Sequence, residues 1–260
     1  MSIRCAIMQP SYIPWMGYFA LADAVDVFIL LDTVQLTKRN WDVRNRIKDA
    51  KGNELMLSVP IRKIRPREEL LIRDALINDD MKWRRKHLAS FQVNYRKAPW
   101  FDAAHELFAE TLEKEINGHI ARLNEAFFRD TCAILGIETR ILRASDLPVT
   151  ATGKARRLVE LCKAVGAQTY VSAAGSAVYL EEREAREMFA EAGINIRYQD
   201  YRHPVYPQVN GPFLSHMSIL DVLANTGPRK AAEHVRKGHR EVASASPLGP
   251  GTARKENADE

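Results

Sequence analysis

The sequence of 260 residues has little of what marks a secreted, membrane-spanning or metal-binding protein. No basic and then apolar segment opens the chain, and the longest uncharged apolar stretch, Val27–Leu31, is far shorter than the roughly 20 residues of a membrane helix. The three cysteines, Cys5, Cys132 and Cys162, are widely separated, and none has zinc-ligand spacing to another cysteine or a histidine. We therefore expect a cytoplasmic protein without a transmembrane segment, a disulfide bond or a metal site.

Signatures of common catalytic machinery are also missing. The sequence has no P-loop, G-x-S-x-G, H-E-x-x-H or kinase motif, so nothing in it supports a nucleophilic serine or a catalytic metal. Small residues at 171–180 stand between a predicted strand and a predicted helix, where backbone amides can hold a phosphate, but they do not match G-x-G-x-x-G. The sequence therefore leaves open whether a cofactor such as ATP is used.

The sequence is rich in positive charge. Its formal net charge is +5, and basic residues gather in three segments, at 38–51, 62–67 and 82–86. Such clusters suit a phosphorylated ligand, an anionic membrane surface or nucleic acid, whereas a solvated basic face is the simpler interpretation of the third cluster. Because no nucleic-acid-reading module accompanies the charge, we do not expect nucleic acid to be the partner.

The order of apolar runs and helical patterns predicts an α/β fold. Short apolar runs rich in β-branched residues, at 3–8 and 25–31, flank a helical segment, which is the strand–helix–strand order of a parallel sheet. Strand and helix alternate again later, with strands expected at 139–145, 169–175 and 195–201. We predict a mostly parallel, Rossmann-like sheet flanked by helices.

Three amphipathic helical patterns lie between residues 78 and 135, and we interpret them as a helical insertion. A further apolar run at 55–61 predicts one more strand. Large apolar residues are almost absent from residue 240 onwards. We therefore expect a single domain over 1–239 and a disordered tail over 240–260.

The turn after the first predicted strand, MQPSYIPWMGYF at 8–19, is the first candidate site. Its prolines, aromatic residues and glycine exceed what a plain strand-to-helix turn needs. Rigid aromatic side chains form a preorganised binding wall at little entropic cost, although a hydrophobic plug that closes the core is the alternative. The candidate binding residues are Gln9, Tyr12, Trp15, Gly17 and Tyr18.

A second candidate segment, LLDTVQLTKRNWDVRNRIK at 30–48, begins where the second predicted strand ends. Asp32, a candidate catalytic base, would stand at the carboxyl edge of the sheet, where open parallel sheets bind ligands. Arginines bind phosphate or carboxylate bidentately and a tryptophan face stacks on a base or sugar, whereas a surface hairpin with ordinary charges is the alternative. The candidate binding residues are Gln35, Lys38, Arg39, Trp41, Arg44, Asn45 and Arg46.

The third candidate segment, HPVYPQ at 203–208, follows the predicted strand at 195–201. His203 is the best general acid–base candidate among seven histidines because two X-Pro steps hold its loop rigid, although a loop histidine that only makes hydrogen bonds is the alternative. Tyr206 and Gln208 are candidate binding residues beside it. We expect all three segments to meet in one pocket at the carboxyl edge of the sheet.

Together these segments resemble the motifs of the WbqC-like protein family. The resemblance runs from about residue 3 to 228, is carried most strongly by the two N-terminal segments, and includes YRHPVYPQVNGPFLSHMSILDVLANTG near the end. It departs in SAAGSAVYL at 172–180, where the family pattern has a glycine directly after the serine and a basic residue near 177. This chain has Ala173 and Ala177 there, so we do not expect that turn to bind phosphate.

The family is associated with bacterial surface polysaccharides such as O-antigen, including ones whose amino sugars carry amide-linked amino acids. The resemblance implies a transferase or ligase that forms an amide, by acyl or aminoacyl transfer, on a nucleotide-linked amino sugar. A phosphorylated substrate and an acyl donor or carrier would then be its partners. The layout is distantly similar to that of nucleotidylyltransferases, but PWMGYF replaces their HxGH pair. The alternative function is a non-catalytic scaffold or binding protein of polysaccharide assembly.

Overall fold

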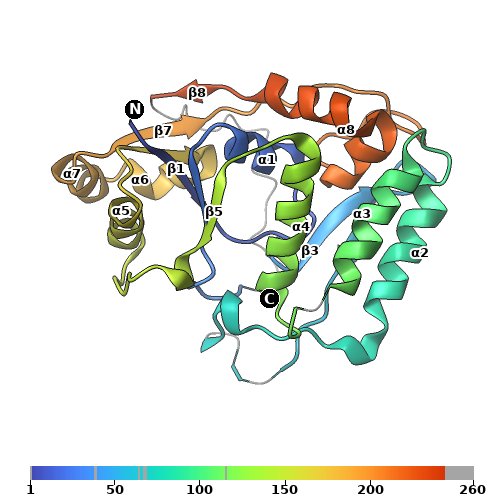
Figure 1. The fold of residues 1–260 in the computed structure, drawn as a ribbon, viewed down its shortest axis with the longest axis horizontal. Coiled ribbons are helices and arrows are strands. Elements are labelled where there is room, and N and C mark those ends of the chain that lie inside the picture. Colours follow the sequence, from blue (N-terminus) through green and yellow to red (C-terminus); the bar gives the residue numbers. More distant parts are fainter. Residues whose placement is uncertain (1, 38–39, 64, 67–68, 115, 244–260) are drawn as a thin grey trace.

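One mixed sheet organises the chain in the computed structural model, which describes residues 2–37, 40–63, 65–66, 69–114 and 116–243 (Figure 1). Its strands are β1 (Arg4–Met8), β2 (Val27–Leu30), β5 (Arg140–Arg143), β6 (Thr169–Ala173), β7 (Asn195–Gln199) and β8 (Glu241–Val242). They lie in the order β5-β2-β1-β6-β7-β8, and all neighbouring pairs are parallel except β7 and β8. This confirms the predicted α/β fold with a mostly parallel sheet, and its strand order in chain sequence, 3-2-1-4-5-6, is shared with doubly wound Rossmann sheets.

Helices cover both faces of this sheet. Side chains of a strand alternate between its faces, so Cys5 and Ile7 of β1 join one apolar core while Ala6 joins the other. The first core is covered by α5 (Lys154–Ala164), α6 (Ala177–Leu180) and α7 (Arg183–Glu191) (Figure 1). The second core is covered by α1 (Met16–Asp23), α4 (Ile120–Leu135) and α8 (Ile219–Gly238). Within α8, Gly227 adopts φ 77° just before Pro228 and kinks the helix.

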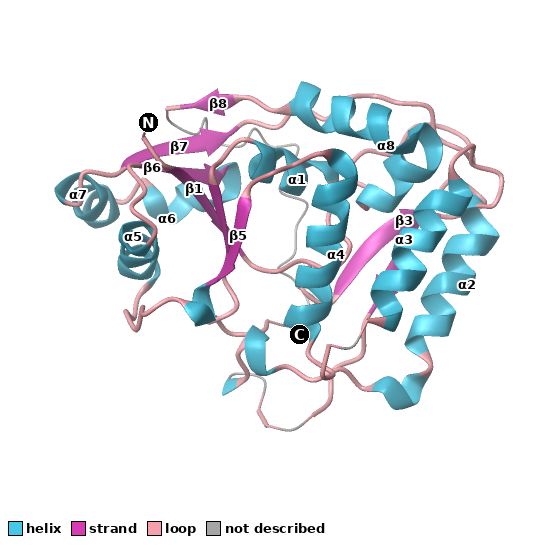
Figure 2. Ribbon diagram, in the orientation of Figure 1, coloured by secondary structure: helices cyan, strands magenta, loops and turns pink. Residues whose placement is uncertain are grey.

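The predicted helical insertion is present between β4 and β5, where α2 (Trp83–Tyr95), α3 (Phe101–Glu113) and α4 follow one another (Figure 2). Short 3₁₀ turns accompany these helices, among them η2 (Ile72–Asp74), η3 (Asp79–Met81), η4 (Ala144–Asp146) and η5 (Ala174–Ser176). Among the described residues, no helix is both long and apolar enough to cross a lipid bilayer.

A separate hairpin carries much of the second candidate segment. Strands β3 (Arg44–Lys48) and β4 (Glu54–Ser58) pair antiparallel, outside the main sheet. The predicted strand at 55–61 is therefore found as β4, and the basic segment before it contains a strand as well. Backbone hydrogen bonds fix the hairpin to other elements: Tyr12 N donates to Trp41 O (2.9 Å), and Ser218 N donates to Arg46 O (2.9 Å). The hairpin thus joins the first turn to the start of α8.

The C-terminal boundary differs from the predicted one. Glu241 and Val242, placed in the expected tail, form β8 on the free edge of β7. Asp200 N donates to Arg240 O at 2.9 Å, and the Glu241 carboxylate pairs with the guanidinium of Arg4. Backbone pairing and an ion pair therefore extend the sheet beyond residue 240. Residues 244–260 of the expected tail lie outside the described residues.

Candidate functional site

Two cavities, each of about 270 Å³, contain some of the predicted site residues. One, which we call the aromatic cavity, is lined by Trp15, Tyr18, Trp41, Asn45, Arg46 and His216, among others. The other, which we call the arginine cavity, includes Asp32 in its lining. Both open near turns that follow parallel strands, at the edge where open α/β sheets bind ligands. The structure therefore brings residues of the first two segments together in the aromatic cavity, but it places Asp32 in the other cavity.

The indole of Trp15 is a closely packed wall of the aromatic cavity. Its ring stands edge-to-face with Tyr201 (centroids 5.0 Å apart), parallel to His203 (6.2 Å, interplanar angle 9°) and tilted against His216 (4.8 Å). It also lies over Gly17, where a Cβ would meet the ring at 2.2 Å. Rings from the first turn and from the segments after β7 thus form one aromatic stack.

Tyr12 and Asn45 hold the turn in place rather than present free groups to a ligand. The Asn45 amide donates to the carbonyls of Tyr12 (2.9 Å) and Ile13 (3.1 Å). Those contacts secure a strained backbone, because Ile13 is β-branched and has φ 36°. The buried Tyr12 hydroxyl is hydrogen-bonded to His87 Nδ1 at 2.7 Å. These two residues therefore fix the backbone of the turn that borders the cavity.

Trp41 forms the outer wall and stands beneath two guanidinium groups. It is 40% exposed, and Arg44 and Arg46 lie over its ring at 5.8 and 5.5 Å. Arg46 also donates through Nη1 to both oxygens of Glu54 (2.9 and 3.0 Å) and through Nε to the carbonyl of His216 (3.1 Å). Among the described contacts, Nη2 is thus the nitrogen that Arg46 keeps available for a ligand.

His203 lies behind Trp15 as a neutral imidazole. Burial, reinforced by the nearby His216, lowers the pKa of His203 to about 4. Its Nδ1 is 3.0 Å from the Pro204 carbonyl, which can only accept, so Nδ1 carries the proton and Nε2 holds the free lone pair. Nε2 is buried and has no hydrogen-bond partner among the described residues. His203 is therefore an acceptor without a donor.

Tyr206 and Gln208 belong to a buried polar network instead of either cavity. The Tyr206 hydroxyl (2.5 Å) and the Gln208 amide (2.7 Å) both donate to Oδ2 of Asp221 on α8. Tyr95 on α2 donates to Oδ1 of the same carboxylate at 2.7 Å. The ammonium of Lys48 on β3 donates to Gln208 Oε1 at 3.2 Å. Hydrogen bonds thus connect the late loop to α8 and to β3, and the same network extends to α2.

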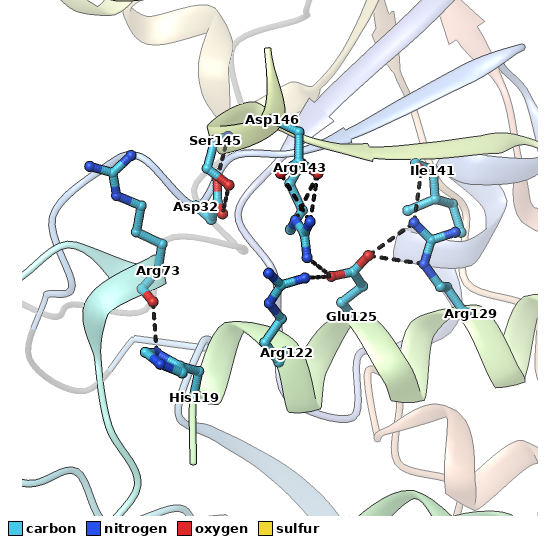
Figure 3. Close-up of polar contacts among 10 residues, drawn as sticks. All are labelled: Asp32, Arg73, His119, Arg122, Glu125, Arg129, Ile141, Arg143, Ser145 and Asp146. Carbon is cyan, nitrogen blue, oxygen red and sulfur yellow. Dashed lines mark hydrogen bonds and ion pairs between the residues drawn. The ribbon is translucent and has the colours of Figure 1, made fainter. Parts of the chain in front are cut away.

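Asp32 follows β2 as predicted, but both of its carboxylate oxygens hold Ser145. The Ser145 amide donates to Oδ1 (2.9 Å) and its hydroxyl donates to Oδ2 (2.6 Å), as Figure 3 shows. The Asp32 side chain is almost fully buried at 2% exposure. Three strand spacings separate β2 from β7, or roughly 14 Å, so Asp32 and His203 stand in different parts of the edge.

The other predicted binding residues are more scattered. Gln9 accepts a hydrogen bond through Oε1 from Asn40 Nδ2 at 2.8 Å. Gln35 is exposed and pairs by its backbone with Leu71. Lys38 and Arg39 lie outside the described residues.

Asp42 is a titratable residue that sequence reasoning did not single out. It is 1% exposed, and burial raises the pKa of its carboxyl to about 7. Asn40 Nδ2 donates to Oδ2 at 2.6 Å, while Oδ1 has no donor among the described residues. Its position directly after Trp41 in a basic segment was the available signal, but only the fold reveals its burial.

The described residues contain no group of three or more metal-ligating side chains.

Two comparisons with known proteins found matches to this chain. A family model described as the WbqC-like protein family matches residues 9–233. The chain is 36% identical over 234 residues to the uncharacterized protein Rv1507c of Mycobacterium tuberculosis, an alignment that covers 90% of this chain and 97% of that relative. No solved structure matches the chain.

Proposed function

This chain belongs to the WbqC-like protein family, and from that premise we propose that it forms an amide on a nucleotide-linked amino sugar of surface-polysaccharide biosynthesis. The reaction would be acyl or aminoacyl transfer. The observation that carries the proposal is the aromatic cavity, in which the walls Trp15 and Trp41 stand at the carboxyl edge of the sheet with a guanidinium at the rim. Such a cavity suits a ligand with a flat or ring-shaped part and a phosphate.

Each wall has a role in this proposal. The face of Trp41 packs on the sugar or the base, and the half-buried ring of Trp15 borders it. The rigid stack behind Trp15 keeps its ring in place without further loss of entropy on binding. Arg44 and Arg46 stand within 6 Å of the Trp41 ring, so a diphosphate next to a stacked ring meets both charges. The sugar and its phosphates are thus held by one hairpin and one turn.

Amide formation sets a requirement for a proton acceptor. The amino nitrogen attacks the acyl carbonyl carbon, the bond from that carbon to the leaving group breaks, and the nitrogen loses a proton to a base. His203 borders Trp15 and has an unprotonated Nε2, so it is our candidate for this acceptor at the aromatic cavity. Asp32 remains a candidate base at the arginine cavity, since each of its oxygens keeps a further lone pair.

Two observations favour a second candidate function, binding without catalysis. Nε2 of His203 is buried and reaches a ligand only if a neighbouring ring moves, and both oxygens of Asp32 already accept hydrogen bonds from Ser145. A scaffold or binding protein needs neither group to be free. In that case the aromatic cavity would hold the nucleotide-linked sugar for another protein.

Product analysis distinguishes the two functions. The purified protein is incubated with UDP- and dTDP-linked amino sugars, together with acyl thioesters or with ATP and amino acids, and the sugars are analysed by mass spectrometry. An enzyme yields a mass increase equal to the mass of the carboxylic acid minus one water, and His203→Ala or Asp32→Asn removes it. If the protein binds a sugar but no donor produces a mass increase, the protein binds its ligand without catalysis.

A further inference from the structure

The arginine cavity brings together three guanidinium groups from three separate elements. Arg73 comes from η2, Arg122 from the first turn of α4, and Arg143 from the end of β5, and all three line the cavity. Figure 3 shows these side chains around Asp32, with Arg73 and Arg143 on opposite sides of it in this view. No element of the chain supplies more than one of these arginines. The fold therefore builds this concentration of N–H donors.

Two of the guanidinium groups donate no hydrogen bond to a described protein group. Arg73 lies 3.7 Å from Asp74 and Arg122 lies 3.7 Å from Glu125, distances that are too long for hydrogen bonds. Both side chains are about half exposed, so these ion pairs stabilise the fold by less than about 1 kcal/mol. Their N–H groups can therefore turn to a ligand at small cost.

One carboxylate forms ion pairs with three arginines in and behind the cavity lining. Glu125 is shared by Arg122, Arg129 (2.9 Å) and Arg143 (3.2 Å), and Arg143 also pairs with Asp146. Within the lining itself, three arginines face two aspartates, which gives a net charge of +1 with histidine neutral. An anionic group entering the cavity would thus find more donors than acceptors.

The N-terminus of α4 points to the same ligand chemistry. His119, Ala121 and Arg122 line the cavity at the start of this 16-residue helix. The N-cap side chain of His119 makes no capping hydrogen bond to the helix and instead contacts the Arg73 carbonyl at 3.0 Å. Among the described residues, no group accepts from the backbone amides of Ala121 and Arg122. Unpaired amides and the helix dipole both favour an oxyanion there.

Asp32 restricts which anion fits. Its carboxylate would repel a second negative charge, but among the described residues each oxygen accepts one hydrogen bond, from Ser145, and can accept another from a ligand. We propose that the arginine cavity binds a small oxyanionic molecule whose phosphoryl or carboxylate group contacts Arg73, Arg122 and the α4 N-terminus, while its hydroxyl or amino group donates to Asp32. The volume of about 270 Å³ suits a ligand no larger than a monosaccharide phosphate.

Calorimetric titration with two hydroxylated probes tests this proposal and distinguishes the two oxyanions. Glycerol 3-phosphate offers a phosphoryl group and glycerate a carboxylate, each beside hydroxyl donors. We expect saturable binding of at least one probe by the full chain, and we expect Arg122→Gln and Arg73→Gln each to weaken it by about tenfold or more. Binding of glycerol 3-phosphate alone assigns the site to phosphoryl groups, and binding of glycerate alone assigns it to carboxylates.

Arg129→Gln is the matched control, because Arg129 lies two turns after Arg122 on α4, pairs with the same Glu125 and has similar exposure, yet does not line the cavity. It should leave binding within about twofold of wild type. Absence of saturable binding for both probes, or equal losses in the Arg122 and Arg129 variants, would overturn the proposal. Trp41→Ala alters the aromatic cavity and should leave this binding unchanged, so a failure of the nucleotide-sugar proposal and a failure of this one can be told apart.

Discussion

The indole ring of Trp15 lies so close over Gly17 that a Cβ on residue 17 would stand 2.2 Å from Cη2 of the ring. This contact leaves no room for a side chain on the residue two positions after the tryptophan. The other face and edges of the ring meet Tyr201, His203 and His216. The aromatic turn is therefore both a plug that closes the end of the core and a wall of a cavity.

Replacement of Gly17 by alanine should displace the Trp15 ring. Within a helix, alanine in place of glycine normally adds at most about 1 kcal/mol of stability, but in this first turn of α1 the overlap with the indole should reverse the sign and cost about 1–3 kcal/mol. Thermal melting and tryptophan fluorescence measure both effects. Gly175→Ala is the control, because a Cβ there meets no atom within 4 Å. Unchanged melting and fluorescence in Gly17→Ala would contradict the close contact.

Tyr206→Phe should destabilise the protein without changing the affinity of the folded protein for a nucleotide-sugar. The substitution removes the hydroxyl that donates to the buried Asp221, which costs about 1–3 kcal/mol. Urea unfolding gives the free energy, and calorimetry below the transition gives the affinity. Tyr179→Phe is the control, since Tyr179 is half-buried in a different core. A large loss of affinity at unchanged stability would instead show that the Tyr206 hydroxyl contributes to ligand binding.

Asp42 should make the free energy of unfolding fall as pH rises. Burial raises its folded pKa from 3.8 to about 7, so between those values the folded chain holds a proton that the unfolded chain has lost. The stabilisation is thus fully present below pH 3.8 and is lost as pH approaches 7, by up to roughly 4 kcal/mol in total. In Asp42→Asn this dependence disappears, so the variant should gain stability relative to wild type between pH 4 and 8.

Urea unfolding at several pH values measures this difference. Asp80→Asn, at an exposed position in η3, controls for a simple change of net charge. Parallel pH profiles for wild type and Asp42→Asn would show that the Asp42 carboxyl is not buried in the way described.

Asp32→Asn tests whether the charge of Asp32 is needed for function. Asparagine can still accept from the Ser145 amide, so we expect a melting temperature within a few degrees of wild type. The loss of charge should nevertheless abolish surface-polysaccharide modification when the variant is expressed in a deletion strain. Full restoration by the variant would remove Asp32 from the functional site and leave it as the residue that positions Ser145.

Much of the fold followed from local pattern. The apolar runs of β1 and β2 with a helix between them predicted parallel strands, and Gly227-Pro228 marked the kink in α8. The proximity of the first two candidate segments was also predictable, because each follows a parallel strand. A backbone hydrogen bond from Tyr12 to Trp41 connects the two segments directly.

Other features depend on contacts between distant segments. Residues of the late loop follow a strand as expected, yet Tyr206 turns inward because Asp221, on α8, offers a buried acceptor. Likewise Arg73, Arg122 and Arg143 lie far apart in the sequence and meet only at the carboxyl ends of β2 and β5. Periodicity cannot indicate which charged residues become neighbours in this way.

The most direct test of the central claim is calorimetric titration of UDP- and dTDP-linked amino sugars into wild type, Trp41→Ala and Trp100→Ala. Both tryptophans are exposed, at 40% and 50%, but only Trp41 lines the aromatic cavity. We predict saturable binding to wild type and to Trp100→Ala, with affinity about tenfold or more lower in Trp41→Ala, since stacking on an aromatic ring contributes about 1–3 kcal/mol. Equal affinity in all three proteins, or no binding of any nucleotide-linked amino sugar to wild type, would contradict the assignment of the aromatic cavity as the substrate site.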